Sequence, residues 1–153
     1  MSNKRRKPTT LPIGSISHGT MRPEDLIPTF LSEAESLRLS KAERATVREI
    51  AKRHNADDYD YDSEEAGYDL EELFDLLSNH VPDYCYFGSH PGDWADYGVW
   101  ISEDIADSDV ARVNDPAELH AVKDNVALFV NDHGNMTLYR RADNRWIEVW
   151  SVV

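Results

Sequence analysis

Histidine and aspartate residues gather in one short segment and could hold a divalent metal ion. The segment His90–Asp96 reads His-Pro-Gly-Asp-Trp-Ala-Asp and offers one imidazole and two carboxylates. Such ligands hold metal ions in hydrolases, where the metal activates a bound water for attack. His133, which follows Asp132 in a turn-forming sequence, is a further candidate ligand. A metal-dependent hydrolase that uses His90, Asp93 and Asp96 is therefore one alternative.

A second group of functional candidates is an acidic run in the middle of the chain. Residues 54–125 carry two Lys/Arg and twenty Asp/Glu, a net charge of −18. Duplex DNA carries one charge per about 1.7 Å, so this excess would match about 30 Å of duplex. Tyrosines in the run would add flat contact area at low entropic cost. The residues predicted to bind a partner in place of phosphates are Asp57, Asp58, Asp60, Asp62, Glu64, Glu65, Glu71 and Glu72, with Tyr59 and Tyr61.

The same run has two other interpretations. Asp58, Asp60 and Asp62 have the spacing that opens a calcium-binding loop. However, Ser63 stands where such a loop needs glycine, and Asp69 stands where it needs glutamate. Alternatively, the carboxylates form a solvated face that keeps the protein soluble. These alternatives remain open from the sequence.

The first 53 residues have the opposite charge. They carry eleven Lys/Arg and six Asp/Glu, a net of +5 in a chain of −13. A predicted second helix would place Arg44, Arg48, Lys52 and Arg53 on its outer face. Because a basic helix suits the DNA major groove, a DNA-binding regulator is a further alternative. The acidic run that follows at once argues against it, since negative charge repels phosphate.

Hydrophobic periodicity predicts three helices in the N-terminal half. The first covers about residues 23–37. The second follows a capping box, Ser40–Glu43, and ends near residue 54. The third is expected to begin near Asp69, as its N-cap, and to end near residue 79. Together these helices would hold the acidic and basic side chains at fixed spacing.

The second half changes to the period of β-strands. Apolar runs bounded by turn residues occur at residues 84–87, 98–101, 125–131, 136–141 and 146–152. The last three are joined by tight turns and predict an antiparallel meander. We expect an α+β fold with two or three N-terminal helices packed on a C-terminal antiparallel sheet. Residues 1–20 are expected to form an extended basic arm, and residues 21–153 a single α+β domain.

Composition narrows the functional classes. The hydrophobic fraction of 41% is enough for a folded core. Cys85 is the single cysteine, which excludes an internal disulfide and a thiolate metal site. No apolar run approaches the roughly 18–20 residues of a membrane span. No phosphate-binding loop or serine-hydrolase motif is present in the sequence. We expect a cytoplasmic protein that is not an enzyme, with no catalytic residue, cofactor or bound metal.

Several stretches are similar to one group of proteins. Ser15–Ile27 reads Ser-Ile-Ser-His-Gly-Thr-Met-Arg-Pro-Glu-Asp-Leu-Ile, and Val130–Asn135 reads Val-Asn-Asp-His-Gly-Asn. These stretches, together with Tyr84–Gly88, Thr137–Tyr139 and Trp150–Val153, resemble parts of small uncharacterised acidic proteins carried by phages and plasmids. The resemblance implies a mobile element in a bacterial cell and assigns no site residues.

The charge distribution and this resemblance predict a non-catalytic phage or plasmid accessory protein. We expect it to bind a basic host protein through its acidic surface. The most concrete form is a nucleic-acid mimic that inhibits a host defence nuclease of a restriction or CRISPR system. The expected partner has a nucleic-acid-binding surface, and binding to a membrane or directly to nucleic acid is not expected.

Overall fold

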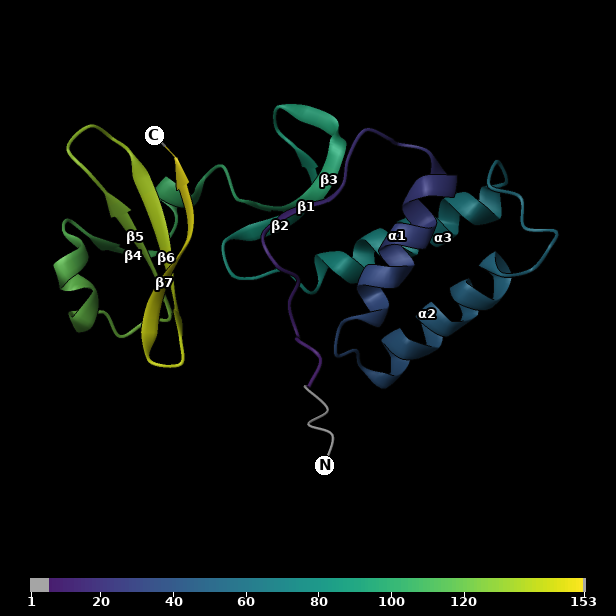
Figure 1. Ribbon diagram of the computed structural model, residues 1–153, viewed down its shortest axis with the longest axis horizontal. Helices are drawn as coiled ribbons and strands as arrows, with labels where there is room; N and C mark the ends of the chain where they lie inside the picture. Colours follow the sequence, from purple (N-terminus) through teal and green to yellow (C-terminus); the bar gives the residue numbers. More distant parts are fainter. Residues whose placement is uncertain (1–5, 153) are drawn as a thin grey trace. The chain divides into compact units, whose positions relative to one another are not determined.

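The computed structural model describes residues 6–152, which divide into two compact units (Figure 1). Unit 1 comprises the described residues up to Trp100, and unit 2 those from Ile101. Helices come first and strands dominate the second half, which confirms the predicted α+β fold. The boundary near residue 100 differs from the single domain expected over residues 21–153. Unit 2 has a hydrophobic cluster of its own, in which Val113, Leu119 and Ala127 are buried.

Within the described part of unit 1 there are three α-helices: α1 (Pro23–Glu35), α2 (Lys41–His54) and α3 (Glu64–Ser78). Helices α1 and α2 lie where periodicity predicts them. The predicted capping box is present at the start of α2. The Ser40 hydroxyl accepts a hydrogen bond from the Glu43 backbone N–H, and the Glu43 carboxylate accepts one from the Ser40 backbone N–H.

Helix α3 begins at Glu64, so the predicted start near Asp69 was wrong. Its N-cap is Ser63, whose hydroxyl accepts a hydrogen bond from the backbone N–H of Ala66 at 3.1 Å. Asp69 instead lies inside the helix and is only 2% exposed. A buried carboxylate needs a partner. Here the partner is Arg53 of α2. Because Arg53 lies on another helix, the local sequence around Asp69 does not reveal this pair.

A three-stranded sheet completes the described part of unit 1. Its strands are β1 (Gly14–Ser17), β2 (Cys85–His90) and β3 (Asp93–Ile101), in the order β1-β3-β2. β1 runs antiparallel to β3 and lies within the segment predicted as an extended arm. The two backbones come very close at Gly98, where an added Cβ would lie 2.2 Å from the carbonyl oxygen of Gly14. Only glycine fits this position without a backbone shift.

Gly98→Ala is therefore expected to displace β1 and to lower the free energy of unfolding by about 2 kcal/mol. Gly67→Ala is the matched control, because Gly67 lies in α3 and a methyl group added there would point into open space. There alanine should stabilise the helix by up to about 1 kcal/mol. Urea unfolding of the two variants measures both effects. A tolerated alanine at Gly98 would contradict the close approach.

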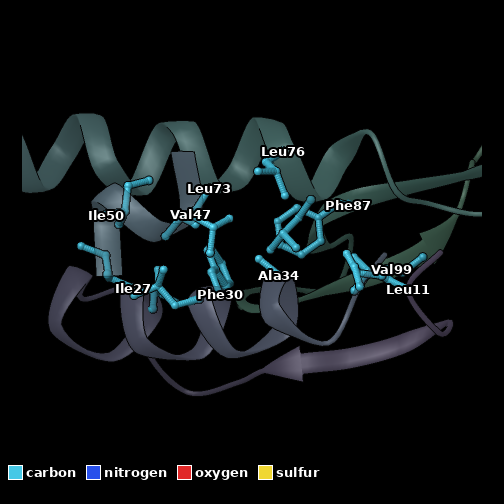
Figure 2. Packing of buried hydrophobic residues seen from close by; sticks show 14 of the residues in the cluster. Leu11, Ile27, Phe30, Ala34, Val47, Ile50, Leu73, Leu76, Phe87 and Val99 are labelled. Carbon is cyan, nitrogen blue, oxygen red and sulfur yellow. The ribbon is translucent and has the colours of Figure 1, made fainter. Parts of the chain in front are cut away.

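The core of unit 1 lies between the helices α1, α2 and α3 and the small sheet (Figure 2). Figure 2 shows Ile27, Phe30 and Ala34 of α1 facing the space beside α3. The Phe30 and Phe87 rings meet edge to face, with centroids 5.3 Å apart. α3 also contacts β2, so the helices of this unit pack on its sheet as expected for an α+β fold. This packing fixes the buried side of α3 and thereby its exposed side.

His80 joins the N-terminal segment to α2. Its Nδ1 lies 2.8 Å from the Thr9 carbonyl oxygen, and its Nε2 lies 2.7 Å from a carboxylate oxygen of Glu43. Burial alone would lower the pKa of His80, but the hydrogen bonds to Thr9 and Glu43 outweigh it and the pKa is raised. Burial likewise opposes ionisation of Glu43, but bonds from Ser40 and His80 lower its pKa overall. The protonated imidazole donates both bonds.

These pKa shifts set a pH window for the contact. The His80 contribution is fully present below its ordinary pKa of 6.5 and is lost as pH rises through the higher folded value. The Glu43 contribution is present above 4.5 and is lost as pH falls through the lower folded value. We expect the stability gap between wild type and His80→Gln to be largest between these values and to shrink as pH rises through the folded pKa of His80. Unfolding at a series of pH values measures it, and a pH-independent gap would contradict the charged bridge.

Unit 2 contains a mixed sheet in its described residues. Its strands are β4 (Ala111–Val113), β5 (Val126–Val130), β6 (Met136–Ala142) and β7 (Arg145–Val152), in the order β4-β5-β6-β7, with 3₁₀-helices η1 (Ile105–Asp107) and η2 (Pro116–Ala121). β5, β6 and β7 pair antiparallel, which confirms the predicted meander. The short strand β4 pairs parallel to β5 and was not predicted.

Candidate acidic binding surface

Helix α3 has one acidic side. Its exposed residues recur at intervals of three and four, which places them on the same side of the helix. We call this set the α3 acidic face: Glu64, Glu65, Tyr68, Glu71, Glu72 and Asp75. The opposite side of the helix contributes Leu73 and Leu77, both fully buried, to the core. The core therefore fixes the direction in which the carboxylates point.

The spacing of charge on this face is close to that of a nucleic-acid strand. Glu64 and Asp75 are eleven residues apart, which corresponds to about 16 Å along the helix axis. The five carboxylates define four intervals over this length, with a mean of about 4 Å along the axis. One strand of duplex DNA carries a charge every 3.4 Å. Tyr68 lies among them and is 64% exposed.

The C-terminal end of the acidic face is unfavourable for the stability of its own helix. Asp75 lies in the last turn, where the helix dipole is negative, and no basic residue lies in that turn. A carboxylate there costs about 0.3–1 kcal/mol. Glu71 and Asp75 are four residues apart, and like charges at this spacing repel each other. The charge at this end of α3 is therefore not arranged for helix stability.

Charge reversals at the two ends of α3 are expected to have opposite effects. Asp75→Lys places a cation in the last turn and should raise the free energy of unfolding by about 1 kcal/mol. Glu64→Lys makes the same change in the first turn and should lower it by a similar amount. Thermal unfolding of both variants at low salt measures the pair. Shifts of the same sign would contradict the dipole argument.

The loop between α2 and α3 carries the other predicted carboxylates. Asp57, Asp58, Asp60 and Asp62 are all exposed. An Asp60 carboxylate oxygen accepts a hydrogen bond from the Asp62 backbone N–H at 2.9 Å, which stabilises a turn. Asp58 and Asp60 also line a hollow of about 300 Å³ beside Arg53. The structure thus brings the predicted aspartates and glutamates to consecutive elements, the loop and α3.

The two predicted tyrosines take part in the packing of this loop. Tyr59 and Tyr61 are half-buried and pack edge to face with each other and with His54. The Tyr59 hydroxyl donates a hydrogen bond to Asp69 at 3.1 Å, and burial together with Asp69 raises the pKa of Tyr59. The Tyr61 hydroxyl lies 2.7 Å from His54 Nε2. Tyr68, which the predicted set does not contain, is exposed. A helix that starts after Ser63 would have placed Tyr68 on the same side as the glutamates.

An ion pair between the half-buried Arg53 and the buried Asp69 fixes α3 to α2. Arg53 bonds the Asp69 carboxylate through two nitrogens, Nη2 at 2.6 Å and Nε at 3.3 Å. Arg53 Nε also lies 3.4 Å from a carboxylate oxygen of Glu65. Bonds to two nitrogens of one guanidinium fix both distance and orientation. Arg53 therefore holds the acidic face in place and is not part of an outer basic surface, whereas Arg44, Arg48 and Lys52 are exposed.

The His90–Asp96 segment forms the end of the β2–β3 hairpin. His90 Nδ1 accepts a hydrogen bond from the backbone N–H of Gly92 at 2.9 Å. Asp93 and Asp96 are three residues apart in β3, and strand geometry directs such residues to opposite faces. His133 belongs to unit 2, in the turn between β5 and β6. Within residues 6–152, no group of three or more His, Cys, Asp or Glu is placed to hold a metal ion.

No protein-family model, curated protein or solved structure gives a significant match to the chain. No helix in the described residues combines the length and apolar character needed to cross a membrane. The function is therefore inferred from the residues of this chain.

Proposed function

We propose that the protein is a non-catalytic accessory protein that binds a basic host protein through its acidic surface. The surface consists of the α3 acidic face and the loop over residues 57–62. The observation that carries the proposal is the charge on α3, where five exposed carboxylates share one side of a helix at about the spacing of strand phosphates.

The chemistry of this surface suits a protein that normally binds nucleic acid. Arginine and lysine side chains that contact phosphates form the same charge-assisted hydrogen bonds with carboxylates. A helix packed on a core holds its carboxylates in place, so binding costs little conformational entropy. The net charge of −13 would also attract a basic partner over a distance and speed the encounter.

A nucleic-acid-mimicking inhibitor of a host defence nuclease is the specific form of this proposal. The resemblance of several stretches to phage and plasmid proteins supports this setting, a bacterial cytoplasm in which a mobile element meets restriction or CRISPR enzymes. The net charge of −13 argues against direct DNA binding by this protein. The same negative charge that repels phosphate attracts a protein whose basic surface binds phosphate.

The test is affinity capture from a bacterial lysate with two charge variants of equal net change. One variant neutralises the α3 acidic face by Glu64→Gln, Glu71→Gln, Glu72→Gln and Asp75→Asn. The control makes four such changes in unit 2, by Glu103→Gln, Asp104→Asn, Asp124→Asn and Asp132→Asn. Wild type and control are expected to capture a nucleic-acid-binding protein that added DNA releases, and the α3 variant should not. Identical captures by the two variants would contradict the proposal.

A further inference from the structure

A second surface of unit 1 is a basic groove beside α2. Two adjoining hollows of about 270 Å³ and about 420 Å³ share the lining residues Lys7, Leu37, Leu39 and Arg44. The first continues along α2 past Val47, Arg48 and Ala51. The second continues to Arg6 and Arg38. We call this continuous surface the basic groove. Its lining consists of cations and aliphatic side chains, with one carboxylate, Glu35, in the first hollow.

The charges of the groove are mostly unpaired within the described residues. Arg38, Arg44 and Arg48 form no ion pair there, although the chain has an excess of carboxylates. Lys7 Nζ donates a hydrogen bond to the Glu35 backbone carbonyl oxygen at 2.8 Å, which ties the N-terminal segment to α1. The guanidinium groups of the groove thus remain available to an anionic partner.

The position of the groove separates it from the acidic face. Arg44 and Arg53 are nine residues apart along α2, which places them on opposite sides of that helix. Arg53 faces α3 and its acidic residues, whereas Arg44 faces the groove. A partner bound in the groove would leave the acidic face open to another. The groove is therefore a distinct site, and an inference about it does not depend on the function proposed above.

We propose that the basic groove binds an acidic amphipathic helix of a partner protein. Arg44 and Arg48 lie one turn apart on α2 and would pair with carboxylates along one edge of such a helix. The aliphatic side chains between the cations would take its apolar stripe, as in other helix-in-groove complexes. Complementarity of both charge and polarity selects this occupant.

A nucleotide or nucleic acid fits the groove less well. None of its described lining residues is aromatic, so a base would find no ring on which to stack. The lining residues also include no glycine-rich loop to present backbone N–H groups to a phosphate. Guanidinium groups over leucine, valine and alanine suit a carboxylate-rich peptide with aliphatic side chains.

The test uses a fluorescent helical peptide of about 18 residues, with a leucine stripe flanked by glutamates. Anisotropy titration should give saturable binding to the full chain. A scrambled peptide of the same composition should bind at least about tenfold more weakly, since it lacks the apolar stripe. A fluorescent DNA oligonucleotide of similar charge should also bind more weakly. Equal binding of the scrambled peptide or of the oligonucleotide would overturn the proposal.

Matched variants place the peptide on the groove. The double variant Arg44→Glu with Arg48→Glu should weaken binding at least about tenfold, because both edge pairs become repulsive. Lys52→Glu changes an exposed cation of α2 outside the groove lining and should have less than about a threefold effect. Circular dichroism checks that both variants are folded. An unchanged affinity of the folded double variant would overturn the proposal. Capture through the α3 acidic face should persist in that variant, which separates the two tests.

Discussion

Replacing Arg53 with methionine is expected to lower the free energy of unfolding by about 3 kcal/mol or more. Methionine preserves much of the aliphatic packing but removes the two nitrogens that bond Asp69. The Asp69 carboxylate is 2% exposed and would retain the Tyr59 hydroxyl as a hydrogen-bond donor, without a neutralising cation. A buried carboxylate without its cation is costly. Chemical denaturation followed by circular dichroism measures the loss.

Two further variants separate this effect from a general loss of positive charge. Lys52→Met removes an exposed cation from the neighbouring position of α2 and should change stability by no more than about 0.5 kcal/mol. Combining Arg53→Met with Asp69→Leu removes both charges and should recover much of the lost stability. Equal effects of the Arg53 and Lys52 variants would show that the ion pair does not hold α3 to α2.

Neutralising the α3 acidic face is expected to weaken binding to the captured partner by about 100-fold at low salt. The variant carries Glu64→Gln, Glu71→Gln, Glu72→Gln and Asp75→Asn. At about 0.7 kcal/mol for each exposed charge pair, four such losses add up to the roughly 2.7 kcal/mol that a 100-fold change requires. Isothermal titration of wild type and variant with the purified partner measures the difference.

Salt should weaken partner binding more for wild type than for the neutralised α3 variant. Screening weakens exposed ion pairs, so wild-type affinity should fall steeply between about 50 and 300 mM salt. The neutralised variant has fewer such pairs and should show a shallower dependence. The unit 2 variant with four equivalent changes should follow the wild type. Parallel salt curves for wild type and the α3 variant would place the binding surface elsewhere.

Local patterns predict the helices and the meander well. α1 and α2 follow their apolar spacing, and the capping box marks the start of α2. The strands β5, β6 and β7 follow one another in the sequence, and each pairs with the next across a short turn. These features depend on neighbours along the chain, so the sequence is enough to locate them.

Long-range contacts account for the differences. β1 forms only because Gly98 lets the distant strand β3 approach Gly14, and hydrophobic spacing does not reveal such an approach. Aspartate is rarely buried inside a helix, so the sequence favours Asp69 as a helix cap. In the structure Asp69 is buried because Arg53 of another helix neutralises its charge. The candidate site shows the same division. Its glutamates could be named from composition, whereas the earlier start of α3 is what places Glu64, Glu65 and Tyr68 on the same helix as the others.

The central claim is that the α3 acidic face occupies a site that otherwise binds nucleic acid. A competition titration tests it most directly, with the purified partner bound to fluorescent duplex DNA and increasing amounts of this protein. Wild type is expected to displace the DNA completely, and the neutralised α3 variant should need about 100-fold more protein for the same displacement. A ternary complex in which the DNA stays bound to the partner together with this protein would contradict the claim.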